Sequence, residues 1–244
     1  MKISNKFIKI EMNQSLVDSI EYKGKEILNT TKKWTKKSPI LFPAIGPNKE
    51  FKIKEDVYKI PKHGFWNDIE FDITSSSNGI ILSGNEENAS YPFYIEADQY
   101  ILLDKNKITY TTTFTGQPIP MQFGYHPAFN YDLGGLKIKQ EKINIINSDM
   151  TNSIMDIDIN NISELPWDKV DTFIFKTNEL VLENKEYNVI VKTNMDYIAL
   201  WTNGDKYICI EPWSNLPALI IPDDNLLLND SSFIMEIIIE EKDM

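Results

Sequence analysis

The sequence predicts an all-β protein built as a large antiparallel β-sandwich. Short segments rich in aromatic and β-branched residues recur along the 244-residue chain, polar turn residues separate them, and helical periodicity is weak throughout. No linker-like run of Pro, Gly or Ser and no internal repeat interrupts this pattern. Since 42% of the residues are hydrophobic, we expect one domain over residues 1–244 with a sizeable core.

The clearest hairpin is predicted in the first half of the chain. Residues 91–103 (YPFYIEADQYILL) and 107–116 (KITYTTTFTG) have strand composition, and the polar stretch 104–107 lies between them. Polar turn residues between two such segments are typical of a β-hairpin.

Further strands are predicted toward the end of the chain. Residues 186–193 (EYNVIVKT) and 197–202 (YIALWT) form a second predicted hairpin through the turn 194–196. Residues 206–210 (KYICI) follow a turn at 203–205, and 233–241 (FIMEIIIEE) form the last strand. Residues 165–169 provide at most a turn.

The composition excludes several classes of function. The formal charge is −11 and all 25 basic residues are lysines, so the chain has neither the positive field nor the guanidinium groups that nucleic-acid binding uses. The single cysteine, Cys209, rules out an intramolecular disulfide and a cysteine-based zinc site. The N-terminal segment and the rest of the chain lack apolar runs of signal-peptide or membrane-span length, so we expect a cytoplasmic protein without membrane contact.

Sequence motifs for common cofactors are also missing. The chain has no GxGxxG, GxxxxGK[ST], HExxH, CxxC or GxSxG pattern. Nucleotide-binding, zinc-protease, redox and serine-hydrolase functions therefore lose their usual support.

Three short stretches place an ionisable side chain beside Pro or Gly and an aromatic residue. They contain His63 (IPKHGFWNDIEF, 60–71), His126 (MQFGYHPAFN, 121–130) and Glu211 (CIEPWS, 209–214). Pro and Gly favour turns and strand ends, where sandwich proteins often build their sites. The aromatic rings provide flat apolar surfaces that suit the C–H faces of a sugar.

Each stretch also has a plain structural explanation. His63 is compatible with an ordinary loop histidine, and His126 with a hydrogen-bonded, partly buried one. Glu211 is compatible with a solvent-facing residue at a strand end, although burial beside the apolar strand YICI would be costly for an unpaired carboxylate.

Taken together, the three stretches resemble the aldose 1-epimerase (galactose mutarotase) family, in particular its LacX-like branch. Members carry similar "HGF", "G-HPAF" and "IEPW" segments in the same order, and the leader at 38–50 (SPILFPAIGPNKE) and the segment from Tyr91 also fit. The resemblance covers about residues 38–215. It implies a β-sandwich of the galactose mutarotase-like (supersandwich) type with an open sugar cleft.

The resemblance also implies roles for individual residues. His126 matches the general acid that protonates the ring oxygen, and Glu211 matches the base that deprotonates the anomeric hydroxyl. His63 matches a second histidine that binds the sugar, and Asp171 matches an aspartate that contacts sugar hydroxyls or, alternatively, is a turn residue at a strand start. We further expect Trp66 or Trp213 to line the cleft.

The chain departs from the family pattern where arginines are expected. Pro47 stands in place of one, and Trp66 and Asn67 follow "HGF" where another is usual. We expect a lysine such as Lys49 or Lys62 to take over one contact, although an ammonium group does not reproduce a planar two-pronged contact.

The resulting prediction is an isomerase that interconverts the anomers of an aldohexose. This reaction needs one acid and one base and no metal or other cofactor, and each proton-transfer partner typically contributes about 10²–10⁴-fold. Two alternatives stay open: a non-catalytic carbohydrate-binding protein of the same fold, and an epimerase for a phosphorylated hexose. We expect the ligand to be a small sugar molecule, an aldohexose. We expect the protein to be a monomer or a homodimer.

Overall fold

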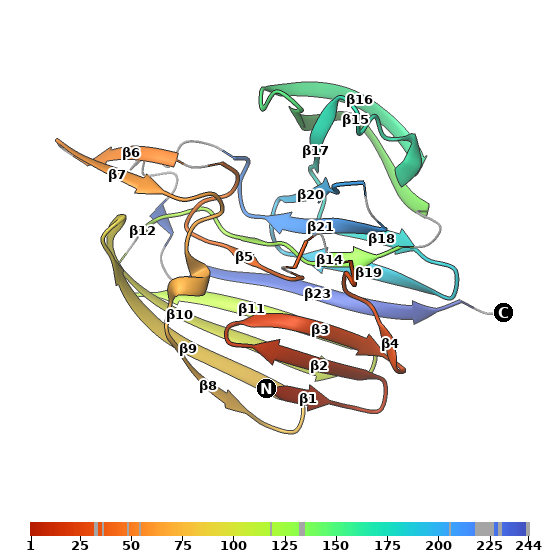
Figure 1. Cartoon of the computed structure of the whole chain (residues 1–244), viewed down its shortest axis with the longest axis horizontal. Coiled ribbons are helices and arrows are strands. Elements are labelled where there is room, and N and C mark those ends of the chain that lie inside the picture. Colours follow the sequence, from red (N-terminus) through yellow and green to blue (C-terminus); the bar gives the residue numbers. More distant parts are fainter. Residues whose placement is uncertain are drawn as a thin grey trace.

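The structure is a computed structural model of the 244-residue chain (Figure 1). It describes residues 1–31, 34–35, 37–47, 49–53, 55–117, 119–131, 135–204, 206–217, 227–228 and 231–242. Two layers of antiparallel strands dominate these residues, which confirms the predicted all-β sandwich.

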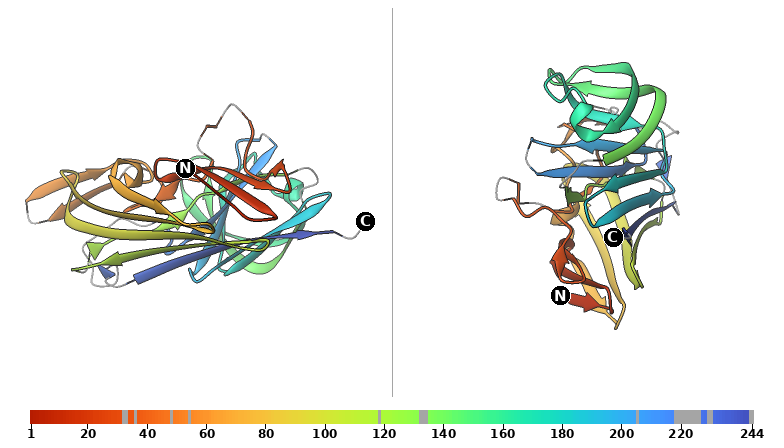
Figure 2. Two further views of the ribbon diagram at one scale, coloured as in Figure 1. Left: turned by 90° about the horizontal axis from the view of Figure 1, so that it is seen from below. Right: turned by 90° about the vertical axis from the view of Figure 1, so that its right-hand side faces the viewer.

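The smaller layer is a four-stranded sheet at the start of the chain. Its strands pair in sequence order: β1 (Lys2–Ser4), β2 (Ile8–Asn13), β3 (Leu16–Tyr22) and β4 (Lys25–Glu26). In two of the views, β1–β3 lie over the part of the large sheet that contains β8–β11 (Figures 1 and 2).

The larger layer is one long, strongly curved sheet of 15 strands in the described part of the chain. Along its main path the strands follow the order β5 (Ile40–Leu41), β13 (Gly124–Tyr125), β21 (Tyr207–Trp213), β20 (Tyr197–Trp201), β17 (Val170–Phe175), β15 (Gly135–Asn147), β18 (Glu179–Glu183), β19 (Tyr187–Thr193), β23 (Ser231–Glu241), β11 (Lys107–Thr115), β10 (Tyr91–Asp104), β9 (Gly79–Asn88) and β8 (Phe71–Ser75). Two more strands join it from the side, β14 (Ala128–Asn130) on β21 and β16 (Asn152–Asn161) on β15.

Short elements complete the described structure. Two-stranded pairs are formed by β6 (Lys49–Ile53) with β7 (Asp56–Ile60), and by β12 (Ile119–Pro120) with β22 (Leu227–Leu228). The helical segments are single 3₁₀ turns, η1 (Trp66–Asp68) and η2 (Ile162–Glu164), and residues 165–169 contain only turns, as predicted. None of the helices among the described residues has the length and apolarity needed to cross a membrane.

The first predicted hairpin is confirmed. Strands β10 and β11 pair directly, with Asp104 opposite Lys107 at the end of the ladder. The turn residue Lys105 adopts a positive φ of 52°, a conformation that tight hairpin turns require. Buried and exposed residues alternate along both strands, so one face of each strand packs into the core.

The second predicted hairpin is wrong, although both of its strands exist. Strand β19 pairs with β18 and β23, whereas β20 pairs with β17 and β21. Asn194, in the connection, exchanges hydrogen bonds with the backbone of Ser232 and Ile234 at 2.8 Å each. Because β23 already occupies the edge of β19, the connection carries the chain to another part of the sheet.

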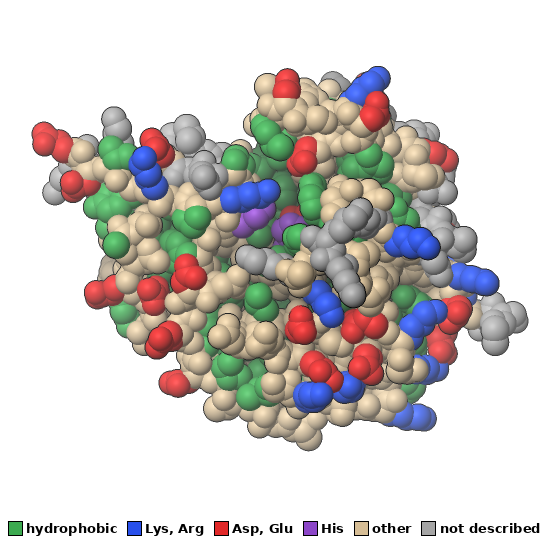
Figure 3. Space-filling view, in the orientation of Figure 1, with side chains coloured by type: hydrophobic (Ala, Val, Ile, Leu, Met, Phe, Trp, Pro, Cys, Tyr) green, Lys and Arg blue, Asp and Glu red, His purple; other side chains and the backbone are tan. Residues whose placement is uncertain are grey.

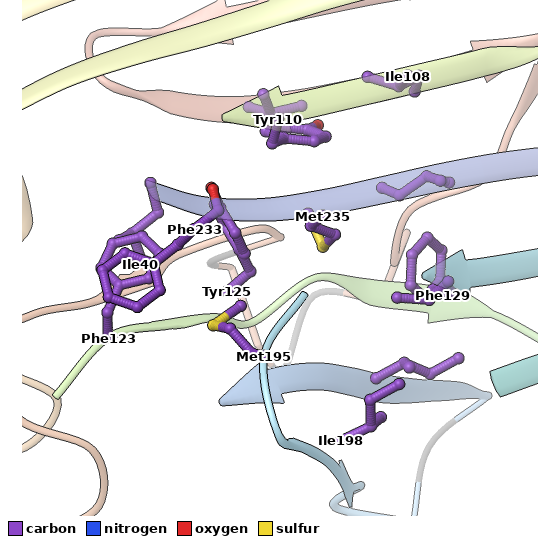
Figure 4. Packing of buried hydrophobic residues seen from close by; sticks show 14 of the residues in the cluster. Ile40, Ile108, Tyr110, Phe123, Tyr125, Phe129, Met195, Ile198, Phe233 and Met235 are labelled. Atoms are coloured by element: carbon purple, nitrogen blue, oxygen red, sulfur yellow. The ribbon is translucent and has the colours of Figure 1, made fainter. Parts of the chain in front are cut away.

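The core anchors the segment that leads to His126. Phe123 stacks on Phe233 with ring centroids 4.7 Å apart, and the Tyr125 hydroxyl donates a hydrogen bond of 2.9 Å to the Phe233 carbonyl (Figure 4). Successive side chains of an extended segment point to opposite faces. With Phe123 and Tyr125 in the core, His126 points to the other side of the sheet.

Candidate functional site

The pairing of three strands brings His126 and Glu211 together. Gly124 on β13 pairs with Trp213 on β21, and Ala128 on β14 continues the same register further along β21. Carried through the gap between β13 and β14, this register places His126 opposite Glu211. Side chains that are directly opposite in an antiparallel pair lie on the same face and within contact distance.

The backbone around His126 is fixed on both sides. The His126 N–H donates to the Pro39 carbonyl at 2.9 Å, and the Pro127 carbonyl accepts a bond of 3.1 Å from the Ile210 N–H. Pro127 has no N–H of its own, so the ladder is interrupted between β13 and β14. The two backbone hydrogen bonds hold the chain in place across this interruption, and the His126 imidazole lies on the cavity side.

The two ionisable side chains are in direct contact. His126 Nε2 lies 3.3 Å from Glu211 Oε1, and the exposed fractions of the two side chains are only 8% and 2%. The indole N–H of Trp213 donates to Glu211 Oε2 at 3.1 Å. Glu211 is therefore neither solvent-facing nor unpaired, and its oxygens are held by two different partners.

Burial strongly affects the protonation of Glu211. It raises the pKa of Glu211 well above the usual carboxyl value, the hydrogen bond from Trp213 opposes this shift, Asp171 adds to it, and Lys62 opposes it. A carboxyl with a raised pKa is a stronger base than an ordinary glutamate. Such perturbed groups in a cavity are candidates for proton transfer.

His63 lies in a tight turn beside His126. It has a φ of 63° and is followed by Gly64 with a φ of 76°. Its Nδ1 accepts a bond of 3.3 Å from the Gly46 N–H, and its ring centroid lies 5.6 Å from that of His126 in an edge-on arrangement. Both predicted histidines therefore face one cavity.

Asp171 lies on β17 and its carboxylate is oriented by two neighbours. The indole N–H of Trp201 donates to Oδ1 at 3.3 Å, and the Thr172 hydroxyl donates to Oδ2 at 2.8 Å. Asp171 is thus a strand residue, and it lines the same cavity as the histidines.

These residues surround a cavity of about 600 Å³. Figure 3 shows it as a hollow with histidine side chains at the bottom and a lysine at the rim. A volume of this size is typical of small-molecule sites. The described lining residues are Trp34, Pro39, Ile40, Leu41, Gly46, Pro47, Lys62, His63, Gly64, Trp66, Asn67, His126, Ile146, Met150, Asn152, Asp171, Thr172, Trp201, Glu211, Trp213 and Pro217.

Four tryptophans are among the described residues that line the cavity, including the two that the sequence analysis selected. Trp66 and Trp213 are among the lining residues, but only 1% and 3% of their surfaces are exposed. Trp34 and Trp201, which the sequence analysis did not select, are partly exposed and line the cavity. A solitary tryptophan within the lysine-rich stretch TTKKWTKK (30–37) was the available signal for Trp34.

One of the two candidate lysines can be placed. Lys62 lines the cavity close enough to lower the pKa of Glu211, which fits the expectation that a lysine supplies a positive charge there. The side chain of Lys49 lies outside the described residues. Lys62 is the only lysine among the described lining residues. The same set contains two carboxyl groups, those of Asp171 and Glu211.

Among the residues that the structure describes, one group of side chains has the composition of a metal site. The potential ligand atoms of His126, Cys209 and Glu211 lie within 4.8 Å of one another. However, burial and the charge of Glu211 raise the pKa of Cys209 well above its usual value, which favours the thiol, whereas metals bind the thiolate. The arrangement favours proton transfer between His126 and Glu211 over metal binding.

Comparison with known proteins identifies the class. The family model described as Aldose 1-epimerase matches residues 14–235, and the chain therefore belongs to the aldose 1-epimerase family. No curated protein matches the chain.

Solved structures agree with the fold. A galactose mutarotase-like protein from Lactobacillus casei superimposes with a TM-score of 0.79 at 18% identity, over 99% of each chain. A galactose mutarotase related enzyme from Lactobacillus acidophilus gives 0.77 at 19% identity, over 100% of this chain and 97% of that one. The aldose epimerase homologue from C. elegans gives 0.70 at 13% identity, over 99% and 98%. The galactose mutarotase-like fold is thus shown.

Proposed function

We propose that this protein is an aldose 1-epimerase that interconverts the α and β anomers of a neutral aldohexose. The observation that carries the proposal is the contact of 3.3 Å between His126 Nε2 and Glu211 Oε1 in a cavity large enough for a sugar. Family membership supports the reaction class.

The reaction begins with ring opening. The Glu211 carboxylate accepts the proton of the C1 hydroxyl, the electrons of that O–H bond form the C1 carbonyl, and the bond from C1 to the ring oxygen breaks. Protonated His126 gives its Nε2 proton to the departing ring oxygen. The open-chain aldehyde then rotates about C1–C2, and the two transfers run in reverse on the other face of the carbonyl.

The close contact of the two groups suits this chemistry. The anomeric hydroxyl and the ring oxygen are bonded to the same carbon, so an acid and a base that act on them must lie next to each other. The contact therefore serves the reaction better than two groups on opposite sides of a wide cleft. The 8% and 2% exposed fractions of the pair keep competing water away.

The surroundings of the pair support its two roles. Burial raises the pKa of Glu211, and a base works best when its pKa approaches the working pH. The Trp213 indole N–H occupies Oε2 and leaves Oε1 toward His126. We assign His63 and Asp171 to the binding of sugar hydroxyls, since both line the cavity and both are fixed by hydrogen bonds.

The charges around the cavity favour a neutral substrate over a phosphorylated one. The described lining residues include one lysine and two histidines beside two carboxyl groups, and His126 is already in contact with Glu211. A phosphate would bring further negative charge and would require more cationic partners. The buried acid–base pair in turn favours an enzyme over a pure carbohydrate-binding protein, because binding alone does not require it.

The proposal is tested by polarimetry on freshly dissolved α-D-glucose and α-D-galactose. We expect the wild-type protein to accelerate the change in optical rotation well beyond buffer, and to act less on α-D-glucose 6-phosphate. A protein that binds these sugars without acceleration would be a carbohydrate-binding protein. Faster turnover of the phosphorylated sugar would contradict the assignment of a neutral substrate.

A further inference from the structure

The rings of Trp34, Trp201 and Tyr207 form a continuous cluster with the ring of His126. The ring of Trp34 lies 5.1 Å from that of His126 and 6.0 Å from that of Trp201, centroid to centroid. Trp34 also stacks on Tyr207 at 5.7 Å with an interplanar angle of 8°, and Trp201 lies 6.2 Å from His126.

Two rings of this cluster are buried and two are accessible from the cavity. Tyr207 is fully buried and His126 is 6% exposed, whereas Trp34 and Trp201 are partly exposed and line the cavity. By contrast, Trp66 is 1% exposed and packs against the rings of Phe71 and Phe42, and Trp213 is 3% exposed with its indole N–H bonded to Glu211. The apolar ring surface available to a ligand therefore belongs to Trp34 and Trp201.

Both tryptophans are held in position. The side-chain amide of Asn29, itself fully buried, donates to the Trp34 carbonyl at 3.0 Å, and the ring of Trp34 rests on Tyr207. The Trp201 indole N–H is bonded to Asp171 Oδ1 at 3.3 Å. A fixed aromatic surface loses little conformational entropy when a ligand binds.

We propose that Trp34 and Trp201, whose ring planes are inclined by 57°, form an angled aromatic wall against which the apolar C–H face of the sugar ring packs, and that Trp201 also orients Asp171 toward the sugar hydroxyls. This assignment rests on the proposed function, because it takes an aldopyranose as the ligand. The wall lies beside His126, so a ring packed on it is presented to the acid. Substrates are thereby selected by the flat apolar face they offer, in addition to their hydroxyls.

The test compares tryptophan variants with a matched control. Trp34→Ala and Trp201→Ala remove one side of the wall, Trp34→Phe and Trp201→Phe retain a ring, and Trp167→Phe changes a tryptophan that packs on Phe173 away from the cavity. We expect each alanine variant to raise KM for galactose and glucose about fivefold to tenfold, the size of one aromatic contact, with kcat within about twofold. Trp167→Phe should match the wild type.

Intrinsic fluorescence measures binding independently of turnover. Galactose titrations should change the emission of the wild type and of Trp167→Phe, and the change should be smaller in both Trp34→Phe and Trp201→Phe. A signal that persists in these two variants but disappears in Trp213→Phe would overturn the assignment. Melting temperatures within a few degrees of the wild type verify that each variant is folded.

The orienting role of Trp201 has its own test. If Trp201 acts through Asp171, Trp201→Phe should raise KM in the wild type but produce no further increase in an Asp171→Ala background, because coupled residues are not additive. Equal increases in both backgrounds would contradict the orienting role.

The outcomes separate the wall from the proposed reaction. An active wild type whose Trp34 and Trp201 variants keep their KM and fluorescence response would refute the wall and leave the epimerase. An inactive wild type whose fluorescence responds through these two residues would refute the epimerase and leave the wall. A protein that neither turns over nor binds any of the tested aldoses would refute both.

Discussion

At the residue scale, the central feature is a buried carboxyl group. Glu211 is 2% exposed, and burial raises its pKa well above the value of about 4.5 that it has when unfolded. Between these two pKa values the folded protein keeps a proton that the unfolded chain has lost. The free energy of unfolding should therefore fall as the pH rises from about 4.5 toward the folded-state pKa.

Replacing this group should remove that pH dependence. Glu211→Gln keeps the shape and an acceptor for Trp213 but has no proton to lose, so its stability relative to the wild type should increase as the pH rises. Urea unfolding between pH 5 and 8 measures the difference, and Glu55→Gln at an exposed turn serves as the control. A constant difference across this range would show that burial does not raise the pKa of Glu211.

Lys62 acts on the same carboxyl group from a distance. Its positive charge lowers the pKa of Glu211, so Lys62→Ala should raise that pKa further and move the acidic limb of kcat/KM to higher pH. KM should also rise, by roughly twofold to tenfold, if Lys62 contacts the sugar.

The control for Lys62 is a lysine outside the cavity. Lys59→Ala removes an exposed lysine that pairs with Glu50 at 3.2 Å. Its pH profile should coincide with that of the wild type. Coincident profiles for Lys62→Ala and the wild type would exclude Lys62 from the electrostatics of the site.

At the element scale, the turn that carries His63 depends on Gly64. A Cβ at Gly64 would lie 1.8 Å from the Phe42 carbonyl oxygen, and its φ of +76° is unfavourable for other residues. Gly64→Ala should lower the free energy of unfolding by about 2–5 kcal/mol, from a backbone penalty of about 1–2 and a steric penalty of about 1–3 kcal/mol.

Gly24 provides a matched control for this prediction. Its φ is +82°, and an added Cβ would meet nothing within 4 Å. Gly24→Ala should therefore show the backbone penalty alone, about 1–2 kcal/mol. Equal losses for the two variants in chemical denaturation would contradict the close approach of Gly64 to Phe42.

Local patterns predicted individual strands better than their partners. The turn at 104–107 forms a hairpin because no other strand inserts between β10 and β11 in the sheet. The connection 194–196 has the same local pattern, yet β18 and β23 occupy both edges of β19. Since such competition depends on strands far away in the sequence, only the assembled sheet decides it.

At the scale of the whole molecule, the site joins segments that are distant in the sequence. The pairing of β13 and β14 with β21 brings His126 to Glu211, and the turn at His63 reaches the same cavity. Their shared location was predicted from the resemblance of three motifs to a family. Composition and periodicity alone do not predict that His63, His126 and Glu211 lie in one cavity.

The aromatic wall shows what the sequence could not predict. Trp34 lies in a polar stretch without strand periodicity, and Trp201 reads as the end of an ordinary strand. Their exposure in the cavity results from the packing of Tyr207 and the bond to Asp171, which are properties of the folded chain. Trp66 and Trp213, beside the motifs, were chosen from their sequence positions and are mostly buried.

The most direct test of the central claim is the rate of anomer exchange, measured by NMR saturation transfer on galactose or glucose at equilibrium. The wild type should exchange anomers far faster than buffer, and Glu211→Gln and His126→Gln should each lower kcat by about 10²-fold or more. The double variant should lose much less than the product of the two single losses, because the groups act as a unit. Full exchange activity in folded Glu211→Gln would contradict the assignment of Glu211 as the base.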